Sequence, residues 1–391
     1  MSPRFATYLD ANAGAPLGPE VREALLRALS SELLPNPSSI HAFGREAKKL
    51  LNDARENVAR SFGVSSSSDQ ITFTSSGTEA SQLAIRSVLE PAFHRGEKPH
   101  WITTPVEHDA TLRMIDWTKE RGGSVSFLPI DSNGAPDAQA LSELVTPATR
   151  LVSAIWVNNE TGVISNVEKL SEKAAQAKIP LHLDGAQAWG KLELDLPKLG
   201  AAFVSFSGHK IGALSGTGVL WKAKAPLHFD GALSPVILGT QESLRRGGTE
   251  NLAGIISLGE ASMRLKPAPW DSRVRPVRER LEKEILGRIS EVKVNGAGAP
   301  RVANTLSLSF EGINRSGLVP ALDLAGFAVS SGSACSSGVD EPSHVLMAMG
   351  HSKGSASASI RVSLCDEISE ETQNRFIEAL SASVQRLRKS N

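Results

Sequence analysis

The sequence predicts an α/β protein built on a largely parallel sheet, and two observations carry this prediction. Short apolar or β-branched runs alternate with segments of helical periodicity over most of residues 15–260, which is typical of βαβ units. A turn of small polar residues follows most of these runs. Such turns would lie at the carboxyl ends of parallel strands, which is where α/β sheets bind ligands. The 391 residues are enough for two or three domains.

Composition excludes several classes of protein. Lysine plus arginine and aspartate plus glutamate both number 42, so neither nucleic acid nor an anionic membrane is an expected partner. The two cysteines, Cys335 and Cys365, form no disulfide framework, and no pair has the spacing of metal ligands. The first residues lack the apolar core of a signal peptide and no run could span a bilayer. We therefore expect a cytoplasmic protein without a metal.

A large α/β domain is expected over residues 15–262. It begins with two helices, marked by apolar residues at helical spacing over 20–29 and 47–58. Seven strands follow, expected at residues 71–74, 101–103, 125–128, 151–157, 179–183, 203–206 and 219–221. They predict a mostly parallel seven-stranded sheet.

Residues 1–14 and 263–391 are expected to form a smaller α+β domain, because the apolar runs become fewer there. The proline-rich segment 266–270 is interpreted as the joint between the two domains. The elements expected after it are a charged helix over 277–289, strands at 292–294 and 304–310, and a last helix from 369 towards 388.

A run of small residues surrounds Cys335 within this second domain. Such residues bury little apolar surface, so the loop at about 330–342 is expected to be mobile and its thiol exposed. An exposed cysteine on a mobile loop is a candidate nucleophile. An incidental cysteine is the alternative, but packing gives no reason for so many small neighbours. Cys365 follows an alternating strand and is expected to be structural.

Two strand ends carry the residues that an electron-sink cofactor requires. Lys210 follows the run at 203–206, and Asp184 follows the run at 179–183. A lysine at the mouth of a strand suits an amine that must be desolvated. Pyridoxal phosphate needs such a lysine and a carboxylate for its ring nitrogen. A surface lysine and a helix-capping aspartate would be the simpler interpretation of either residue alone, but the pair favours the cofactor.

Further polar groups are expected at the same edge of the sheet. Gly77 and Thr78 begin a helix after the first strand, and free N–H groups at such a start bind phosphate well. An ordinary capping box is a compatible alternative. His108 follows the second strand, and the segment 158–162 follows the fourth. A structural histidine and a plain turn are the alternatives for these two.

These segments together resemble the cysteine desulfurases of the NifS/IscS type, which are fold-type I pyridoxal-phosphate-dependent transferases of the class V aminotransferase kind. The resemblance extends from Tyr8 to about Glu371, and the motifs keep the order and separations of the family. The motifs lie at residues 73–79, 107–108, 157–162, 184–187, 205–210, 246–251, 331–335 and 360–364.

The resemblance implies a role for each matching residue. Lys210 would bind pyridoxal 5'-phosphate covalently and later move the α-proton of the substrate, while Asp184 would pair with the ring nitrogen. His108 would stack on the ring and shuttle a proton of the substrate thiol, and Gln187 would hydrogen-bond the phenolic oxygen. The phosphate would be held by Gly77, Thr78, Ser207 and His209, with Thr249 from the second subunit of a homodimer.

The same resemblance implies the substrate and the product. Asn159, at the cofactor, and Arg361 would bind the carboxylate of L-cysteine, for which the fork of arginine is well shaped. Cys335 would take the sulfur as a persulfide and leave L-alanine. A sulfur-acceptor protein, in iron–sulfur cluster assembly or in thiolation, would then receive the sulfur.

The chain departs from the family at a few positions, and other functions remain open. Gly185-Ala186 stands where Ala-Thr is usual, residues 212–216 replace a Tyr-Gly-Pro-Lys-Gly segment, and Cys365-Asp366 stands where Gly-Arg is common. None of these removes a residue with a chemical role. One alternative is a selenocysteine lyase or another pyridoxal-phosphate-dependent β-lyase. The other is a catalytically weak paralogue that carries sulfur or binds a partner.

Overall fold

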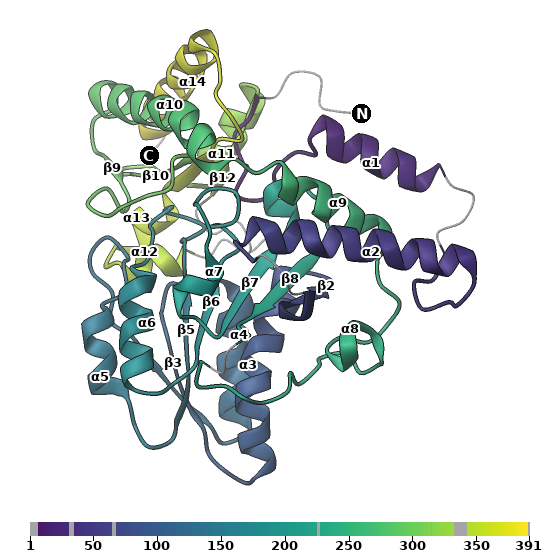
Figure 1. Cartoon of the computed structure of the whole chain (residues 1–391). Helices are drawn as coiled ribbons and strands as arrows, with labels where there is room; N and C mark the ends of the chain where they lie inside the picture. Colours follow the sequence, from purple (N-terminus) through teal and green to yellow (C-terminus); the bar gives the residue numbers. More distant parts are fainter. Residues whose placement is uncertain are drawn as a thin grey trace.

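The described residues form a seven-stranded and a four-stranded sheet, one above the other in Figure 1, and a separate two-stranded pair. The structure is a computed structural model, and it describes residues 7–30, 35–64, 68–224, 227–313, 315–331 and 342–389. A seven-stranded sheet with its helices occupies the lower part of Figure 1, and a four-stranded sheet with helices α10 and α14 occupies the upper part. Helix α10 spans Pro267–Arg288 and α14 spans Glu370–Lys389.

The large sheet is parallel except for one strand, as the sequence predicts. Only β8 is antiparallel to its neighbours, β2 and β7, and all other pairs are parallel. The spatial order is β2 (Ile71–Thr74), β8 (Gly218–Lys222), β7 (Phe203–Ser207), β6 (Leu181–Asp184), β5 (Thr149–Ile155), β3 (His100–Thr103) and β4 (Ser124–Phe127). The carboxyl ends of six strands therefore lie at one edge.

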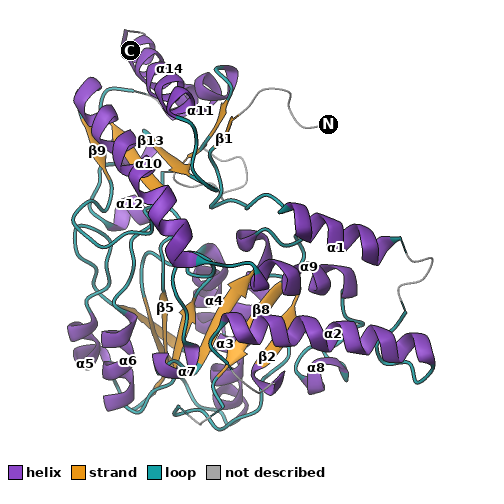
Figure 2. Cartoon of the chain, turned by 45° about the horizontal axis from the view of Figure 1, so that its top comes forward, coloured by secondary structure: helices purple, strands orange, loops and turns teal. Residues whose placement is uncertain are grey.

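Helices cover both faces of this sheet (Figure 2) because successive strand residues point to opposite sides. Phe203 and Leu220 pack against α3, whereas Val204 and Val219 belong to the core on the other face. Helices α3 (Gly77–His94) and α4 (Asp109–Glu120) lie on the first side, and α2 (Ala42–Ser61), α6 (Val167–Gln176) and α9 (Leu252–Met263) contribute to the second core. Helix α1 (Pro19–Leu29) packs on α9. The short helices are α5 (Leu141–Leu144), α7 (Leu196–Leu199) and α8 (Gln241–Leu244).

The smaller sheet has its own hydrophobic core. Its strands are antiparallel, in the order β12 (Ser330–Ser331), β13 (Ser359–Ser363), β10 (Thr305–Phe310) and β9 (Val292–Val294). Apolar residues of α10, α14 and α11 (Arg315–Leu324) cover it. Strand β1 (Thr7–Tyr8) pairs with β11 (Phe327–Ala328), and Leu9 joins this core. The short helices α12 (His344–Ala348) and α13 (Lys353–Ser357) pack in another cluster, with Val106 and Ile155 of the large domain. The domain limits at 15 and 262 remain a prediction, which the separate cores support.

The charged helix expected over 277–289 begins earlier, within the proline-rich segment 266–270. Helix α10 begins at Pro267, ten residues before the helix expected at 277. Proline is well suited to the first turn of a helix, because its missing N–H is not needed there and its φ is already helical. The prolines therefore mark the start of the helix and not a break before it.

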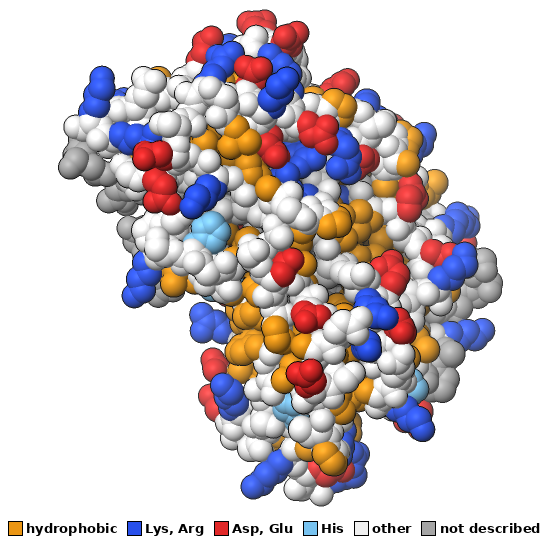
Figure 3. Space-filling view, turned by 90° about the vertical axis from the view of Figure 1, so that its left-hand side faces the viewer, with side chains coloured by type: hydrophobic (Ala, Val, Ile, Leu, Met, Phe, Trp, Pro, Cys, Tyr) orange, Lys and Arg blue, Asp and Glu red, His pale blue; other side chains and the backbone are white. Residues whose placement is uncertain are grey.

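Surface charge is mixed on the face in Figure 3, where acidic and basic side chains are interspersed. Within the described residues, no helix is long and apolar enough to cross a membrane. The same part of the chain holds no group of three or more His, Cys, Asp or Glu side chains that could bind a metal ion.

One departure from the family has a packing reason. Gly185 follows β6 directly, and a Cβ placed on it would lie 2.5 Å from Cε1 of Phe206 and 2.9 Å from Cγ1 of Val204. Phe206 cannot move away, because its ring stacks on Phe62 at 4.5 Å and also meets Trp189 at 5.3 Å. The aromatic cluster therefore requires glycine beside Asp184.

We predict that Gly185→Ala lowers the free energy of unfolding by about 1–3 kcal/mol, because an added methyl group overpacks this cluster. Urea denaturation of the protein measures this. Gly287→Ala is the matched control, since its Cβ would meet nothing within 4 Å on the surface of α10. The control variant should be neutral or slightly more stable. Equal stability of the two variants would contradict the packing argument.

Candidate active site

A cavity of about 330 Å³ opens at the carboxyl edge of the large sheet. Residues that follow β2, β3, β5, β6 and β7 line it, together with Asn12 near the amino terminus and Arg361 on β13. The predicted binding residues in its wall are Gly77, Thr78, His108, Asn159, Asp184, Gln187, Ser207, His209, Lys210 and Arg361. The structure thus brings these residues together, although their individual roles stay predictions.

One end of the cavity has the properties of a phosphate site. Helix α3 begins at Gly77, and the Glu79 carboxylate accepts from the N–H and the hydroxyl of Ser75 at 2.7 and 2.6 Å. The N–H groups of Gly77 and Thr78 lie in the first turn, where no carbonyl of the helix can accept them. A Cβ on Gly77 would lie 3.0 Å from Cβ of Ser207. The close approach of these two segments and the helix start together suit an anion.

The acidic group expected for the ring nitrogen is buried. Asp184 ends β6 and is 7% exposed, and its Oδ1 accepts from the N–H of Ala186 at 3.0 Å. Burial raises the pKa of Asp184, while His108, this hydrogen bond and Lys210 lower it. A protonated ring nitrogen beside the carboxylate would supply the missing opposite charge.

The hydrogen bond by which His108 caps a helix decides which of its ring nitrogens carries the proton. His108 precedes α4, and its Nδ1 accepts from the N–H of Ala110 at 3.1 Å. An accepting nitrogen carries no proton, so the neutral imidazole is protonated at Nε2. The neighbouring His209 has its pKa lowered to about 4, first by burial and then by Lys210 and His108. His209 is therefore neutral near pH 7, and its Nδ1 pairs with Oγ of Ser207 at 3.0 Å.

Two residues to which the sequence interpretation assigned no role hold the cationic groups. Nζ of Lys210 donates to the carbonyl of Asn12 at 2.6 Å. Arg361 is 2% exposed, and its Nη2 donates to Oδ1 of Asp10 at 2.7 Å. Its Nη1 donates to the carbonyl of Asn159 at 3.0 Å, whereas its buried Nε has no partner among the described residues. The only signal for Asp10 and Asn12 was their place near Tyr8, where the resemblance to the family begins.

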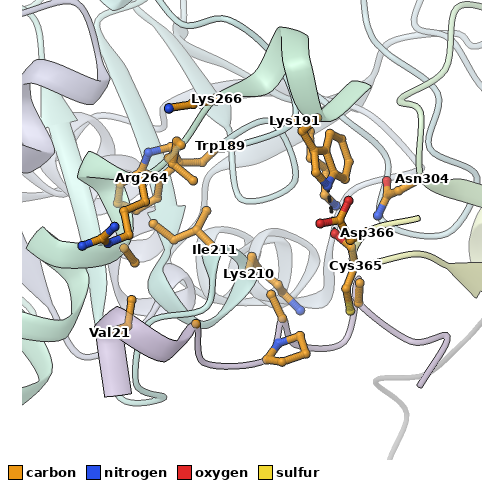
Figure 4. Close-up of a pocket in the computed structure, with 18 of the residues that line it drawn as sticks. Val21, Trp189, Lys191, Lys210, Ile211, Arg264, Lys266, Asn304, Cys365 and Asp366 are labelled. Carbon is orange, nitrogen blue, oxygen red and sulfur yellow. Dashed lines mark hydrogen bonds between the residues drawn. The ribbon is translucent and has the colours of Figure 1, made fainter. Parts of the chain in front are cut away.

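A larger cavity lies on the other side of Lys210 (Figure 4). Its volume is about 570 Å³, and Lys210 is the only predicted site residue in its wall. Cys365 also lines it, and burial is the main cause that raises the pKa of this thiol to about 11. A thiol that stays protonated near pH 7 is a poor nucleophile, as expected for a structural cysteine.

Two predicted residues lie outside this constellation. Thr249 is exposed and does not line the cavity of its own chain. Cys335 lies outside the described residues.

A buried aspartate, a lysine and a phosphate-binding helix start at one edge of such a sheet define the class of the protein, a fold-type I pyridoxal-phosphate enzyme. The family model described as aminotransferase class-V matches residues 7–376. A cysteine desulfurase of Nostoc sp. is 37% identical over 385 residues, which cover 97% of this chain and 93% of the relative. The cysteine desulfurase NifS of Azotobacter vinelandii is 37% identical over 384 residues, with 97% and 93% covered.

Solved structures agree with these relatives. A NifS-like protein superposes with a TM-score of 0.88 at 30% identity and covers 98% of this chain and 100% of its own. A NifS-like protein from Rickettsia africae has a TM-score of 0.86 at 29% identity, with 97% and 99% covered. The chain belongs to the class-V aminotransferase family and, within it, to the cysteine desulfurases.

Enzymes of this family use pyridoxal 5'-phosphate, and the residues present fit this cofactor. The start of α3, which closely approaches Ser207, would hold the phosphate. Asp184 would face the ring nitrogen, and Nε of Arg361, which has no partner among the described residues, would face a substrate carboxylate. The residues around the cavity therefore offer a partner for each charged group of the cofactor and of an amino-acid substrate.

Glu107 is a buried carboxyl directly before His108. Its Oε1 accepts from Thr104 Oγ1 at 2.5 Å and from the N–H of Ile155 at 2.8 Å, while Oε2 has no partner among the described residues. Burial raises the pKa of Glu107 to about 8, against the opposing effect of these two hydrogen bonds. The native state therefore keeps the carboxyl protonated at pH 7.

We predict that Glu107→Gln becomes more stable relative to the unmodified protein as the pH rises. Between the unfolded pKa of about 4.5 and the native value of about 8, the unfolded chain releases a proton that the native state retains. The native protein loses stability over this window, whereas glutamine does not titrate. Urea denaturation should show the difference growing by roughly 2–4 kcal/mol from pH 5 to pH 8. A constant difference would show that Glu107 ionises normally.

Proposed function

We propose that the protein is a pyridoxal-phosphate-dependent cysteine desulfurase, a sulfurtransferase that converts L-cysteine to L-alanine and passes the sulfur to an acceptor protein. The observation that carries this function is the single cavity that gathers Lys210, Asp184, His108 and Arg361. The membership in the cysteine desulfurases supports the choice of substrate. A cytoplasmic location stays a prediction.

The residues of the cavity divide the chemistry among them. Bound pyridoxal 5'-phosphate supplies an electron sink for the charge that develops on the substrate. Asp184 holds the proton of the ring nitrogen, and Arg361 with Asn159 holds the substrate carboxylate. The amine of Lys210 takes up the α-proton, and Nε2 of His108 exchanges a proton with the substrate thiol. Asp184 and Arg361 are buried, which keeps bulk water from competing for their hydrogen bonds.

The sulfur step assigns the remaining role to Cys335. Its thiolate attacks the substrate sulfur, so that an S–S bond forms while the C–S bond breaks. The electron pair of the broken bond remains on the substrate carbon, which is protonated and leaves as the methyl group of alanine. The cysteine side chain retains the sulfur as a persulfide. No outside oxidant is needed, because the two electrons that the sulfur gives up stay on the substrate carbon, which is reduced to the methyl group of alanine.

We predict that L-cysteine with a reductant yields equal amounts of alanine and sulfide, and that Lys210→Ala abolishes both. Cys335→Ser should abolish sulfide release, because the persulfide cannot form. Alanine quantification and a sulfide assay on the same samples measure this. Continued sulfide release by Cys335→Ser would favour a β-lyase, and a protein that binds no pyridoxal phosphate would favour a carrier function.

We propose that the protein acts as a homodimer in which Thr249 completes the phosphate site of the partner. Thr249 is exposed and is not among the residues that line the cavity of its own chain. Large apolar side chains are exposed on α1, on α2 and beside α8, where burial between two subunits would remove them from water. Examples are Leu29 at 58%, Phe43 at 60% and Leu238 at 83% exposed.

A subunit-mixing experiment tests this shared site. Lys210→Ala and Thr249→Asp should each be nearly inactive, the second because a negative charge repels the phosphate. Mixed subunits should regain about a quarter of the activity, since half of the dimers are mixed and each holds one intact site. Mixing Lys210→Ala with the double variant Lys210→Ala/Thr249→Asp is the control and should regain none. Absence of recovery in the first mixture would place Thr249 in the site of its own chain.

A further inference from the structure

A second lysine, Lys191, lies behind the cavity and contacts two residues of its wall. Its side chain is buried, with 7% of the residue exposed. Nζ donates to Oδ1 of Asn12 at 2.8 Å and also to Oε1 of Gln187. In Figure 4, Lys191 lies on the wall of the larger cavity near Cys365 and Asn304. Lys191 thus lies between the two cavities and contacts the one that holds the predicted site.

The hydrogen bonds donated by Lys191 decide which way the two amides point. Nζ is the donor in both contacts, so the atoms that it meets in Asn12 and Gln187 are oxygens. The amide nitrogen of Gln187 is therefore turned the other way, where Nε2 donates to the carbonyl of Asn12 at 3.0 Å. This bond uses one N–H, and the second N–H is available to the cavity that Gln187 lines.

Lys191 orients Asn12 in the same manner. Oδ1 of Asn12 also accepts from Nδ2 of Asn304 at 3.1 Å, so Nδ2 of Asn12 must face Thr305 Oγ1 at 2.9 Å. The carbonyl of Asn12 then accepts from both Gln187 and Lys210. One ammonium group consequently sets the positions of the groups that surround the catalytic amine.

Placing this lysine in the interior has a cost. Burial lowers the pKa of Lys191 well below its usual value, and repulsion from Lys210 and Arg361 adds to this. The acceptors of its two hydrogen bonds are neutral amides and not carboxylates. A methionine of similar length would fill the same space without the desolvation of a charge, so packing alone does not explain a lysine here.

We propose that Lys191 is a positioning residue that holds the Gln187 amide with its N–H towards the phenolic oxygen of pyridoxal 5'-phosphate. This inference rests on the cofactor site of the proposed function. Without Lys191 the amide can rotate and present its carbonyl, which repels an anionic oxygen. The phenolic oxygen then loses a donor and becomes more basic, so the proton that it shares with the cofactor linkage at Lys210 is held more tightly.

The pH titration of the bound cofactor's visible absorbance tests this. For Lys191→Met we expect the midpoint to rise by about one pH unit, the size expected when a charge-stabilising hydrogen bond is lost. Lys191→Arg keeps the donors and should retain a midpoint close to that of the unmodified protein. The turnover number should fall in Lys191→Met while the KM for cysteine changes little. Lys198→Met removes an exposed lysine and should change nothing.

A double variant separates positioning from a general loss of structure. In a Gln187→Ala background, Lys191→Met should no longer shift the midpoint, since the amide that it orients is gone. If Lys191→Met does not fold, as thermal melting without cofactor would show, Gln187→Glu replaces it. Its carboxylate still accepts from Lys191 but offers no N–H, so the midpoint should rise in the same way.

The outcomes are distinct from those of the proposed function. An unchanged midpoint in folded Lys191→Met, or in Gln187→Glu, overturns the positioning role while the unmodified protein still makes alanine. A shift of equal size in the Gln187→Ala background shows that Lys191 acts by another route and also overturns it. An unmodified protein that binds pyridoxal phosphate but forms no alanine overturns only the desulfurase activity. One that binds no pyridoxal phosphate overturns both.

Discussion

The hydrogen bonds of Asn12 are the constraint on which the arrangement of the site depends. Asn12 is 2% exposed, and both its backbone and its amide make hydrogen bonds. Its partners belong to the loops after β5, β6 and β7, to the residue just before β10, and to strands β10 and β13. They are Asn159, Gln187, Lys191, Lys210, Asn304, Thr305 and Ser363. Leaving a buried amide without a hydrogen-bond partner costs more free energy than the bond contributes when it is made. These segments therefore hold one another in place. The cavity is complete only when both sheets are folded.

Burial then determines the electrostatics around this network. Glu107 and Glu160 have their pKa values raised to about 8 and about 7, mainly by burial. The hydroxyl of Ser343 donates to Glu160 at 2.5 Å, which joins the turn after β5 to the start of α12. Charges inside such a site interact strongly, because little water screens them. A protonated ring nitrogen of a cofactor beside Asp184 would supply an opposite charge to this buried carboxylate.

Much of the fold and the site could be predicted because the relevant patterns are local. Each strand of the large sheet is a short apolar run, and parallel strands bring the residues after them to one edge. Lys210 and Asp184 could be paired in this way although 26 residues separate them. The start of α10 could not be predicted from a local pattern, because prolines at 267 and 269 are compatible either with a break in the chain or with the first turn of a helix. The helix is favoured because Val274 and Val277 pack into the hydrophobic core of the smaller sheet.

The sequence by itself indicated which residues are expected to carry the chemistry, since strand periodicity and motif spacing are properties of neighbouring residues. Only the tertiary structure decided how those residues are held. Arg361 meets Asp10 from 351 positions away, and Lys191 meets Asn12 from 179 positions away. Even the glycine beside Asp184 is explained only by the ring of Phe206 on the next strand. Hydrogen-bond direction and close packing depend on the positions of atoms that the chain brings together from distant segments, and no local pattern records them.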